Sequence, residues 1–293
     1  MMAKISAKLV MQLRDKSGVG IMAAKKALVE SDGDMDKAMD LLREKGMAKA
    51  AKKSGKVAAE GLTAIEIEGN NAVIVELNSE TDFVAASDPF KQLLSKLAKL
   101  LVEKQPADVA AAEELSFDDG TSVKQALATT TQQTGEKISI RRFEIVKKDD
   151  NDHFGPYLHQ GGRIASLVVL EGADNKTAKN VAMHVAAINP EFMTKHDVPA
   201  DRLAHEKEVF KQETLNEGKP EKIVDRIVEG RLNKFLSEIC LADQDFVMDS
   251  DKTVGEYVAA NNGKLKSFVR YEVGEGIEKK QSDIAQEVQD QLK

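Results

Sequence analysis

The sequence is short of cysteine and of aromatic residues, and both shortages limit what the protein can be. Its 293 residues include one cysteine, Cys240, so no disulfide can form within the chain. One cysteine also cannot build a zinc site from several thiolates. Tryptophan is absent and aromatic residues make up 4% of the chain, so few side chains could stack on single-stranded bases. These shortages favour a protein of a reducing compartment that does not use thiolate metal chemistry.

Long apolar runs are missing as well. No stretch approaches the roughly 18 apolar residues that span a membrane. The first residues lack the apolar centre of a signal peptide, so we expect a cytoplasmic protein without membrane contact. The chain carries 42 basic and 49 acidic residues, a formal net charge of −7. Because phosphate contacts require a basic surface, we expect no direct contact with nucleic acid.

Reactive groups do not assemble into a recognisable catalytic pattern. Both the Walker-type phosphate loop and the G-x-S-x-G turn of serine hydrolases are missing. Residues 18–23 fit G-x-G-x-x-A, but a helical pattern precedes them where a dinucleotide site requires a strand. His205-Glu206 does not continue into a zinc-protease pattern. We therefore expect no catalytic residue, no bound metal, no cofactor and no enzymatic activity.

Two histidines and the cysteine have simple structural interpretations. His184 and Cys240 lie in mostly apolar patterns, which predicts that both are buried in the core. His159 lies in a loop flanked by glycine and proline, where a solvated position and a functional one both stay open.

Helical periodicity predicts three short helices at the start of the chain. Breaks at 18–20 and 32–34 separate three apolar stripes, and the third is expected to end at Gly46. A lysine-rich stretch over 48–56 follows. It fits either a solvated helical linker or a basic strip that faces an acidic partner.

The middle of the chain mixes strands with helices. The expected elements are strands at 62–68 and 72–78 around Gly69-Asn70-Asn71, a long helix after Asp88-Pro89, a weaker helix near 123–128, and a strand pair at 138–146 and 164–170. This irregular order favours an α+β fold with antiparallel sheets over a doubly wound parallel sheet.

The last third of the chain begins with a helical hairpin. Two helical patterns within 198–238 are separated by Glu217-Gly218-Lys219-Pro220, and the second has a long apolar stripe. Such a stripe suits a projecting hairpin or a coiled coil. A strand at 267–273 and an amphipathic helix with Ile284, Val288 and Leu292 on one face are expected to complete the chain.

Residues 78–84 place an aromatic residue beside an acid where the chain should leave a sheet. If Phe83 lies at a loop tip, its ring can enter a pocket of a partner, and Asp82 can compete near a metal–phosphate site. The alternative makes Phe83 the first core residue of the next helix and Asp82 its N-cap. These residues alone leave both interpretations open.

The same segment carries a resemblance to a known family. Thr81-Asp82-Phe83-Val84 resembles the signature of translation elongation factor Ts of the bacterial type. Other similar segments follow in the right order between about Ile5 and Lys280: Leu13-Arg14, Gly18-Val19-Gly20-Ile21-Met22, Lys25-Lys26-Ala27-Leu28, Ala182-Met183-His184-Val185-Ala186-Ala187, Phe246-Val247-Met248, Lys252-Thr253-Val254-Gly255 and Val273-Gly274-Glu275-Gly276.

The resemblance implies a domain order. Residues 1–56 would form a helical module like the ubiquitin-associated (UBA) domain, with a linker. The remaining units would be a core N-subdomain at 57–145, a C-subdomain at 146–197 and 239–275, an inserted helical hairpin or coiled coil at 198–238, and a C-terminal helical module at 276–293.

The resemblance also implies a function. Members of this family are guanine-nucleotide exchange factors for elongation factor Tu, the GTPase that carries aminoacyl-tRNA to the ribosome. By resemblance, Thr81, Asp82, Phe83 and Val84 would intrude near the magnesium site of Tu and promote GDP release. The residues expected to contact Tu elsewhere are Arg14, Ile21, Met22 and Lys25 on the N-terminal docking face and His159 in a core loop.

Two positions depart from the family pattern, and two other functions stay open. Glu80 and Ala24 stand where many members carry Gln and Cys. The chain could instead be an interaction module that works through its UBA-like helices without nucleotide exchange, or an enzyme on the α+β core. The hairpin could pair with a second copy, giving a homodimer, or with Tu.

Overall fold

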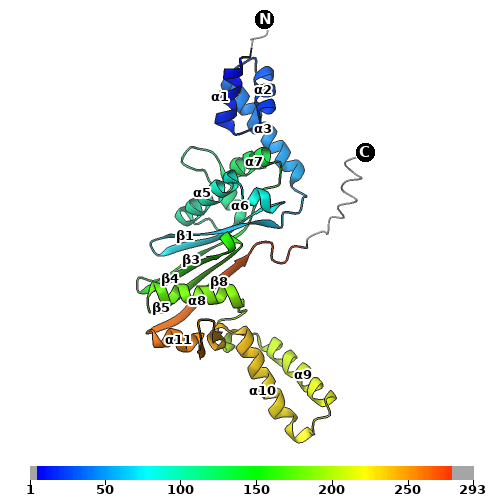
Figure 1. Cartoon of the computed structure of the whole chain (residues 1–293), viewed down its shortest axis with the longest axis vertical. Coiled ribbons are helices and arrows are strands. Elements are labelled where there is room, and N and C mark those ends of the chain that lie inside the picture. The colour runs from blue at the N-terminus through cyan, green and yellow to red at the C-terminus, as the bar shows by residue number, and fades with distance from the viewer. Residues whose placement is uncertain (1–4, 279–293) are drawn as a thin grey trace. The chain divides into compact units, whose positions relative to one another are not determined.

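The computed structural model describes residues 5–278, and the chain separates into two compact units (Figure 1). The first unit contains the described parts of Met1–Glu66, Val75–Ile145 and Glu272–Lys293. The second contains Ile67–Ile74 and Val146–Tyr271. Helices and small antiparallel sheets occur together in both units, which confirms the α+β class. Of the expected C-terminal helical module at 276–293, residues 279–293, which include Ile284, Val288 and Leu292, lie outside the described residues.

The first unit begins with the predicted helices α1 (Ala7–Ser17), α2 (Ile21–Glu30) and α3 (Met35–Lys53). The Ser6 hydroxyl accepts a hydrogen bond from the Leu9 N–H at 3.2 Å and caps α1. Gly18 ends that helix in the left-handed conformation, so residues 18–20 form a turn between helices. The helices share a small core of Val10, Leu13, Val19, Ala24, Ala27, Leu28, Ala38 and Leu42.

The predicted end of the third helix at Gly46 is wrong, because α3 continues to Lys53. Gly46 is buried inside the helix, and a β-carbon there would lie 2.8 Å from the side-chain oxygen of Gln132. The small residue thus allows a close approach between helices. Alanine and lysine, which favour helix, extend α3 through the lysine-rich stretch.

The three-stranded sheet of the first unit consists of β1 (Glu60–Glu68), β2 (Asn71–Ser79) and β3 (Ser139–Lys147), with β2 in the centre. The two-residue turn at Gly69-Asn70 confirms the predicted hairpin. Helices gather on one side of this sheet (Figure 1): α4 (Asp82–Ala85), α5 (Asp88–Lys104), α6 (Val109–Glu113) and α7 (Val123–Thr134). The amphipathic α5 buries Phe90, Leu93, Leu97 and Leu101.

A buried carboxylate attaches the segment after the last strand to this sheet. Glu76 on β2 is fully buried and accepts hydrogen bonds from Arg141 at 3.1 Å and from Arg142 at 2.7 Å. It also accepts a hydrogen bond from the Gly274 N–H at 2.8 Å. The two guanidiniums in turn donate to Glu275. Removing one arginine would leave the buried Glu76 carboxylate incompletely paired. The stability of the cluster therefore depends on all of its members.

The second unit contains a sheet in the order β4 (Asp152–His159), β5 (Ile164–Gly172) and β8 (Gly263–Glu272). The expected pairing of 138–146 with 164–170 is therefore wrong, since β5 pairs antiparallel with β4 instead. The sequence did not predict β4, because Gly155 and Pro156 are residue types typical of loops. An added β-carbon at Gly155 would collide with the backbone of α8 (Asn175–Ile188), so glycine serves close packing of that helix.

The remaining elements of the second unit are short, apart from the helical hairpin. They are η1 (Gln160–Gly162), η2 (Lys195–Asp197), η3 (Leu241–Asp243), β6 (Asp245–Phe246), β7 (Asp249–Thr253) and α11 (Val254–Ala260). Some of these short elements pack with β5 and α8 around a shared core, which includes Val168, Leu170, Val181, Val185, Leu241, Phe246, Val254 and Val258. Cys240 is fully buried as predicted, and burial raises the pKa of its thiol to about 11.

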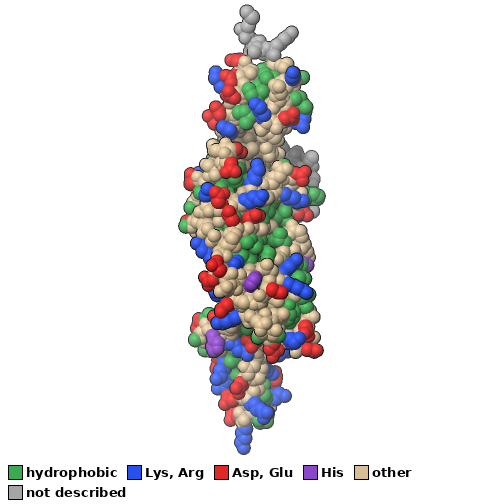
Figure 2. All heavy atoms as spheres, turned by 90° about the vertical axis from the view of Figure 1, so that its left-hand side faces the viewer, with side chains coloured by type: hydrophobic (Ala, Val, Ile, Leu, Met, Phe, Trp, Pro, Cys, Tyr) green, Lys and Arg blue, Asp and Glu red, His purple; other side chains and the backbone are tan. Residues whose placement is uncertain are grey.

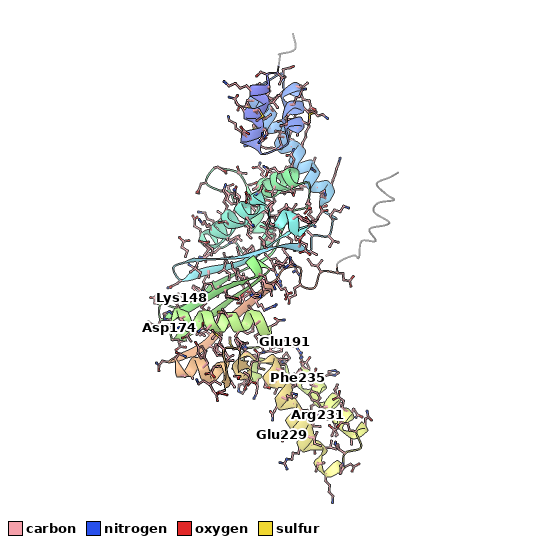
Figure 3. All side chains as sticks on the ribbon, in the orientation of Figure 1. Lys148, Asp174, Glu191, Glu229, Arg231 and Phe235 are labelled. Carbon is pink, nitrogen blue, oxygen red and sulfur yellow. The ribbon has the colours of Figure 1, made fainter. Side chains whose placement is uncertain are left out.

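The predicted helical hairpin consists of α9 (Ala200–Asn216) and α10 (Glu221–Ile239), which pack on each other. Arg231 on α10 pairs with Glu217 at 2.6 Å, and Figure 3 shows Phe235 on the same helix. The Arg202 guanidinium from α9 lies 5.7 Å from the centre of the Phe235 ring. The apolar residues of α10 take part in a core at the base of the hairpin, where Leu236 and Ile239 pack with Val198 and Cys240.

His184 on α8 is a fully buried core residue, as predicted. Its Nδ1 accepts a hydrogen bond from the Val247 N–H at 3.3 Å, and its Nε2 lies 2.8 Å from Gln244 Oε1. Both contacts are satisfied by a neutral ring that carries its proton on Nε2. Burial lowers the pKa of His184, and the hydrogen bond with Gln244 opposes that shift less strongly.

We predict that stability falls as pH drops through the titration of the unfolded histidine. Unfolded His184 takes up a proton near its ordinary pKa of about 6.5, whereas the folded residue stays neutral until a lower pH. The buried neutral ring contributes its full stabilisation above the pKa of the unfolded histidine. Each pH unit below that value lowers the free energy of unfolding by up to about 1.4 kcal/mol. Urea unfolding at pH 7.5 and 5.5 measures the difference. His184→Gln should reduce this pH dependence and the exposed control His205→Gln should not; equal dependence in all three proteins contradicts the assignment.

Candidate functional site

The loop after β2 presents an aromatic side chain to solvent. Thr81 caps the four-residue helix α4, and its hydroxyl accepts a hydrogen bond from the Val84 N–H at 3.3 Å. Phe83 is 84% exposed, Asp82 is exposed and Val84 is half-buried. The alternative in which Phe83 enters the core with Asp82 as N-cap is therefore wrong. Thr81 is the cap, and the first fully buried aromatic after the loop is Phe90.

Two carboxylates hold the root of this loop. Glu136 accepts hydrogen bonds from the Thr81 N–H at 2.9 Å and from the Thr81 hydroxyl at 2.7 Å. Glu80 accepts from the Lys137 N–H at 2.7 Å and from the Lys53 ammonium at 2.9 Å. Partial burial alone would raise the pKa of Glu80, but these two hydrogen bonds hold that pKa below its usual range. The loop is thus fixed from behind while its aromatic tip stays free.

The predicted N-terminal docking residues lie on the first two helices, and all are exposed. Arg14 is on α1, whereas Ile21, Met22 and Lys25 are on α2. Ile21 is 51% exposed and Met22 is 75% exposed, so two neighbouring apolar side chains lie at the surface of this small helical module. Two cations thus accompany a small apolar surface.

An open groove of about 910 Å³ lies in the first unit next to the aromatic loop. Phe83 and Val84 line it, together with residues from α1, α3, α5 and α7. The basic side chains in its wall are Lys16, Arg43 and Lys96, and Asp119 is an acidic neighbour. None of the four predicted docking residues belongs to this wall. Figure 2 shows acidic and basic side chains interspersed over the visible face.

His159 ends β4 in the second unit, beside a tight turn. The turn over Gln160, Gly161 and Gly162 has positive φ angles at all three residues. His159 is exposed, and its Nδ1 lies 3.1 Å from the Tyr157 hydroxyl. The neighbouring Leu158 is 46% exposed, so this turn presents a second small apolar surface.

Comparison with known proteins gives one consistent result. Residues 80–275 match the sequence model of a family described as Elongation factor TS. The elongation factor Ts of Limosilactobacillus reuteri is 72% identical over 291 residues, 99% of this chain and 100% of that protein. The chain belongs to the elongation factor Ts family. Its relatives in Limosilactobacillus fermentum, at 68% identity, and Levilactobacillus brevis, at 62%, each align over at least 99% of both chains.

The described residues of this family member show neither a candidate metal site nor a membrane-spanning helix. Between residues 5 and 278, no group of three or more His, Cys, Asp or Glu side chains is placed to hold a metal ion. Within the same range, no helix is both long and apolar enough to cross a bilayer.

Sequence reasoning missed the residues that hold the family signature in place. Glu136 and Lys137 lie 55 and more residues from the loop that they anchor, and neither belongs to a recognisable pattern. Lys53 lies in the lysine-rich stretch for which a solvated linker and a basic strip both stayed open, and it pairs with Glu80 of the same chain. The signal that could have found Glu80 is its departure from the family pattern, because a carboxylate there attracts a cation.

Proposed function

We propose that this chain is the guanine-nucleotide exchange factor for elongation factor Tu in translation elongation, and that it works without chemical catalysis in the cytoplasm. The observation that carries the proposal is the exposure of Phe83 on a loop that is anchored from behind. A ring held in water gains a large apolar contact area only when it enters a partner. Membership of the elongation factor Ts family supports Tu as that partner.

The proposed mechanism follows from how a GTPase holds GDP. The nucleotide is bound mainly through its phosphates, by backbone N–H groups and Mg²⁺. Phe83 would separate the elements that carry these groups, and Asp82 would repel the phosphates and attract the magnesium ion. Because coupling between sites is reciprocal, GDP must also weaken binding of this chain by the same factor. GTP can then displace the factor after exchange.

Docking is divided among several surfaces in this proposal. Arg14, Ile21, Met22 and Lys25 of the UBA-like module bind the GTPase domain, and His159 binds through its core loop. We also propose the domain boundaries expected from the sequence, and a docking role for the C-terminal module at 276–293. The α9–α10 hairpin is proposed as a coiled coil whose exposed Leu215 and Ile223 pair with a second copy.

The test of this function is the release of fluorescent GDP from purified elongation factor Tu in a stopped-flow instrument. Adding this chain should accelerate release by several orders of magnitude and saturate with concentration. If the chain binds Tu while release stays at its spontaneous rate, the interaction-module alternative is correct and the exchange proposal is wrong.

We predict that Phe83→Ala lowers the maximal rate of GDP release at saturating factor by at least about tenfold. Removing the ring deletes a contact that is made only when the nucleotide site is disturbed, and a tenfold change equals about 1.4 kcal/mol. Because the ring is exposed, circular dichroism should show unchanged thermal unfolding.

Met22→Ala is the matched control for this variant, since it also truncates an exposed apolar side chain. It should raise the concentration needed for half-maximal release but leave the maximal rate nearly intact, because Met22 serves docking. A Phe83→Ala protein that reaches the wild-type maximum would refute the wedge.

A second prediction concerns the helical hairpin. Shortening it, or combining Leu215→Ser with Ile223→Ser, should reduce self-association and change GDP release by less than about twofold, because exposed apolar side chains drive pairing. Sedimentation velocity measures the association state. Lys219→Ser with Lys222→Ser, at exposed positions near the same tip, is the control. Identical sedimentation of the intact and shortened proteins would exclude pairing through the hairpin.

A further inference from the structure

We infer that Glu136 is a positioning residue for exchange: its carboxylate fixes the loop that presents Phe83 and so sets how strongly the docked chain weakens GDP binding. This inference rests on the proposed function and assigns a role to a residue outside the family signature. Glu136 does not contact the partner in this scheme. It acts through Thr81, two residues before the exposed ring.

The geometry makes Glu136 the main support of the loop. One carboxylate accepts both hydrogen bonds that Thr81 can donate, from its N–H at 2.9 Å and from its hydroxyl at 2.7 Å. That donation orients the hydroxyl so that a lone pair faces the Val84 N–H at 3.3 Å. A continuous chain of hydrogen bonds therefore runs from Glu136 through Thr81 to the helix that carries Phe83.

The short helix α4 has few other side-chain contacts: the Ser79 hydroxyl donates to the Thr81 carbonyl oxygen at 2.8 Å, and the Ser87 hydroxyl donates to the Val84 carbonyl oxygen at 2.6 Å. It contains four residues, and Ala85 is the buried one among them. Isolated helices far longer than this are marginal in water, so α4 depends on contacts made at its ends. Phe83 contributes little to this stability, because its side chain is 84% exposed. The direction of the ring is consequently set by the backbone, and the backbone is set by the Thr81 cap.

Glu80 and Lys137 perform a different task beside this anchor. The Glu80 carboxylate ties the end of β2 to the Lys137 N–H and to the Lys53 ammonium. The Lys137 ammonium donates to the Ser54 and Lys56 carbonyl oxygens. These bonds fix the path of the chain around the loop root, and truncating Glu136 leaves all of them in place. Loss of the Glu136 side chain should therefore free α4 without unfolding its surroundings.

Holding the loop in one conformation before docking should make nucleotide exchange faster. A loop that is already ordered loses little conformational entropy when its tip enters the partner. A loosened loop must be ordered at that moment, which reduces the energy left to disturb the nucleotide site. Docking through the N-terminal helices does not involve this loop. The maximal rate of GDP release should thus fall, whereas the concentration for half-maximal release should hardly change.

The experiment compares Glu136→Ala, Glu136→Gln, Thr81→Val and Thr81→Ser with the wild-type chain in stopped-flow GDP release. Glu136→Ala and Thr81→Val should lower the maximal rate about tenfold, because charge-assisted hydrogen bonds are lost. The half-saturating concentration should change by less than about twofold. Glu136→Gln should be intermediate, since its amide oxygen still accepts one bond. Thr81→Ser keeps both donors and should retain most of the rate that Thr81→Val loses.

Hydrogen exchange provides the second readout. The Val84 amide should exchange faster in Glu136→Ala and Thr81→Val, while thermal unfolding should be nearly unchanged. Glu114→Ala removes a carboxylate that is 77% exposed and serves as the control, with rate and exchange as in wild type. If Glu136→Ala does not fold, Thr81→Val decides the question by the same measurements.

The outcomes separate this inference from the function on which it rests. If the wild-type chain itself fails to accelerate GDP release, the proposed function is wrong. If the wild-type chain is active and the two truncated variants reach the same maximal rate, the positioning role is wrong. A variant that shifts only the half-saturating concentration and lowers the unfolding temperature would show a merely structural role and also overturn the inference.

Discussion

The hydrogen bonds from Thr81 to Glu136 are the interaction on which the candidate site depends. A phenylalanine kept in water forgoes roughly 1.5–3 kcal/mol of burial energy, so its own side chain cannot stabilise the segment that presents it. Support must come from polar contacts made behind the loop, and the cap at Thr81 and the carboxylate of Glu136 supply it. The same logic explains the full burial of Phe90 shortly afterwards, which anchors α5 once the chain has returned to the core.

An exchange factor has to bind firmly enough to disturb GDP and loosely enough to be released. Small, separate surfaces meet both needs better than one large apolar interface, because each contributes a limited part of the affinity. The apolar residues around Met22, Phe83 and Leu158 have this form, each beside charged or polar neighbours. If the partner accepts Phe83 only when its nucleotide site is disturbed, as proposed, linkage requires that GDP weakens the binding of this chain by the same factor by which this chain weakens the binding of GDP.

Local patterns in the sequence were sufficient for most elements, whereas residues 78–84 alone left open whether Phe83 is exposed or buried. Breaks at 18–20 and 32–34 separated the first three helices, Gly69-Asn70 marked a hairpin, and the apolar repeat after Asp88-Pro89 marked α5. The errors arose where packing overrode a local signal. Gly46 has the residue type of a helix stop, but it lies inside α3, where its small size lets the Gln132 side chain approach closely. Gly155 and Pro156 suggested a loop, yet they belong to a strand that α8 approaches closely.

The support of the site could not be read from the sequence, because it depends on pairs that only the fold brings together. Glu76, Glu80 and Glu136 look like ordinary members of an acidic chain, and their partners are distant in sequence. Each is nonetheless fixed by geometry, because each carboxylate accepts a hydrogen bond from a backbone N–H: Glu76 from Gly274, Glu80 from Lys137 and Glu136 from Thr81. In the proposed mechanism the exposed ring enters the partner, and the carboxylates behind it orient that ring before docking. The proposed function would then rest on two sets of residues, of which a sequence signature reveals the first.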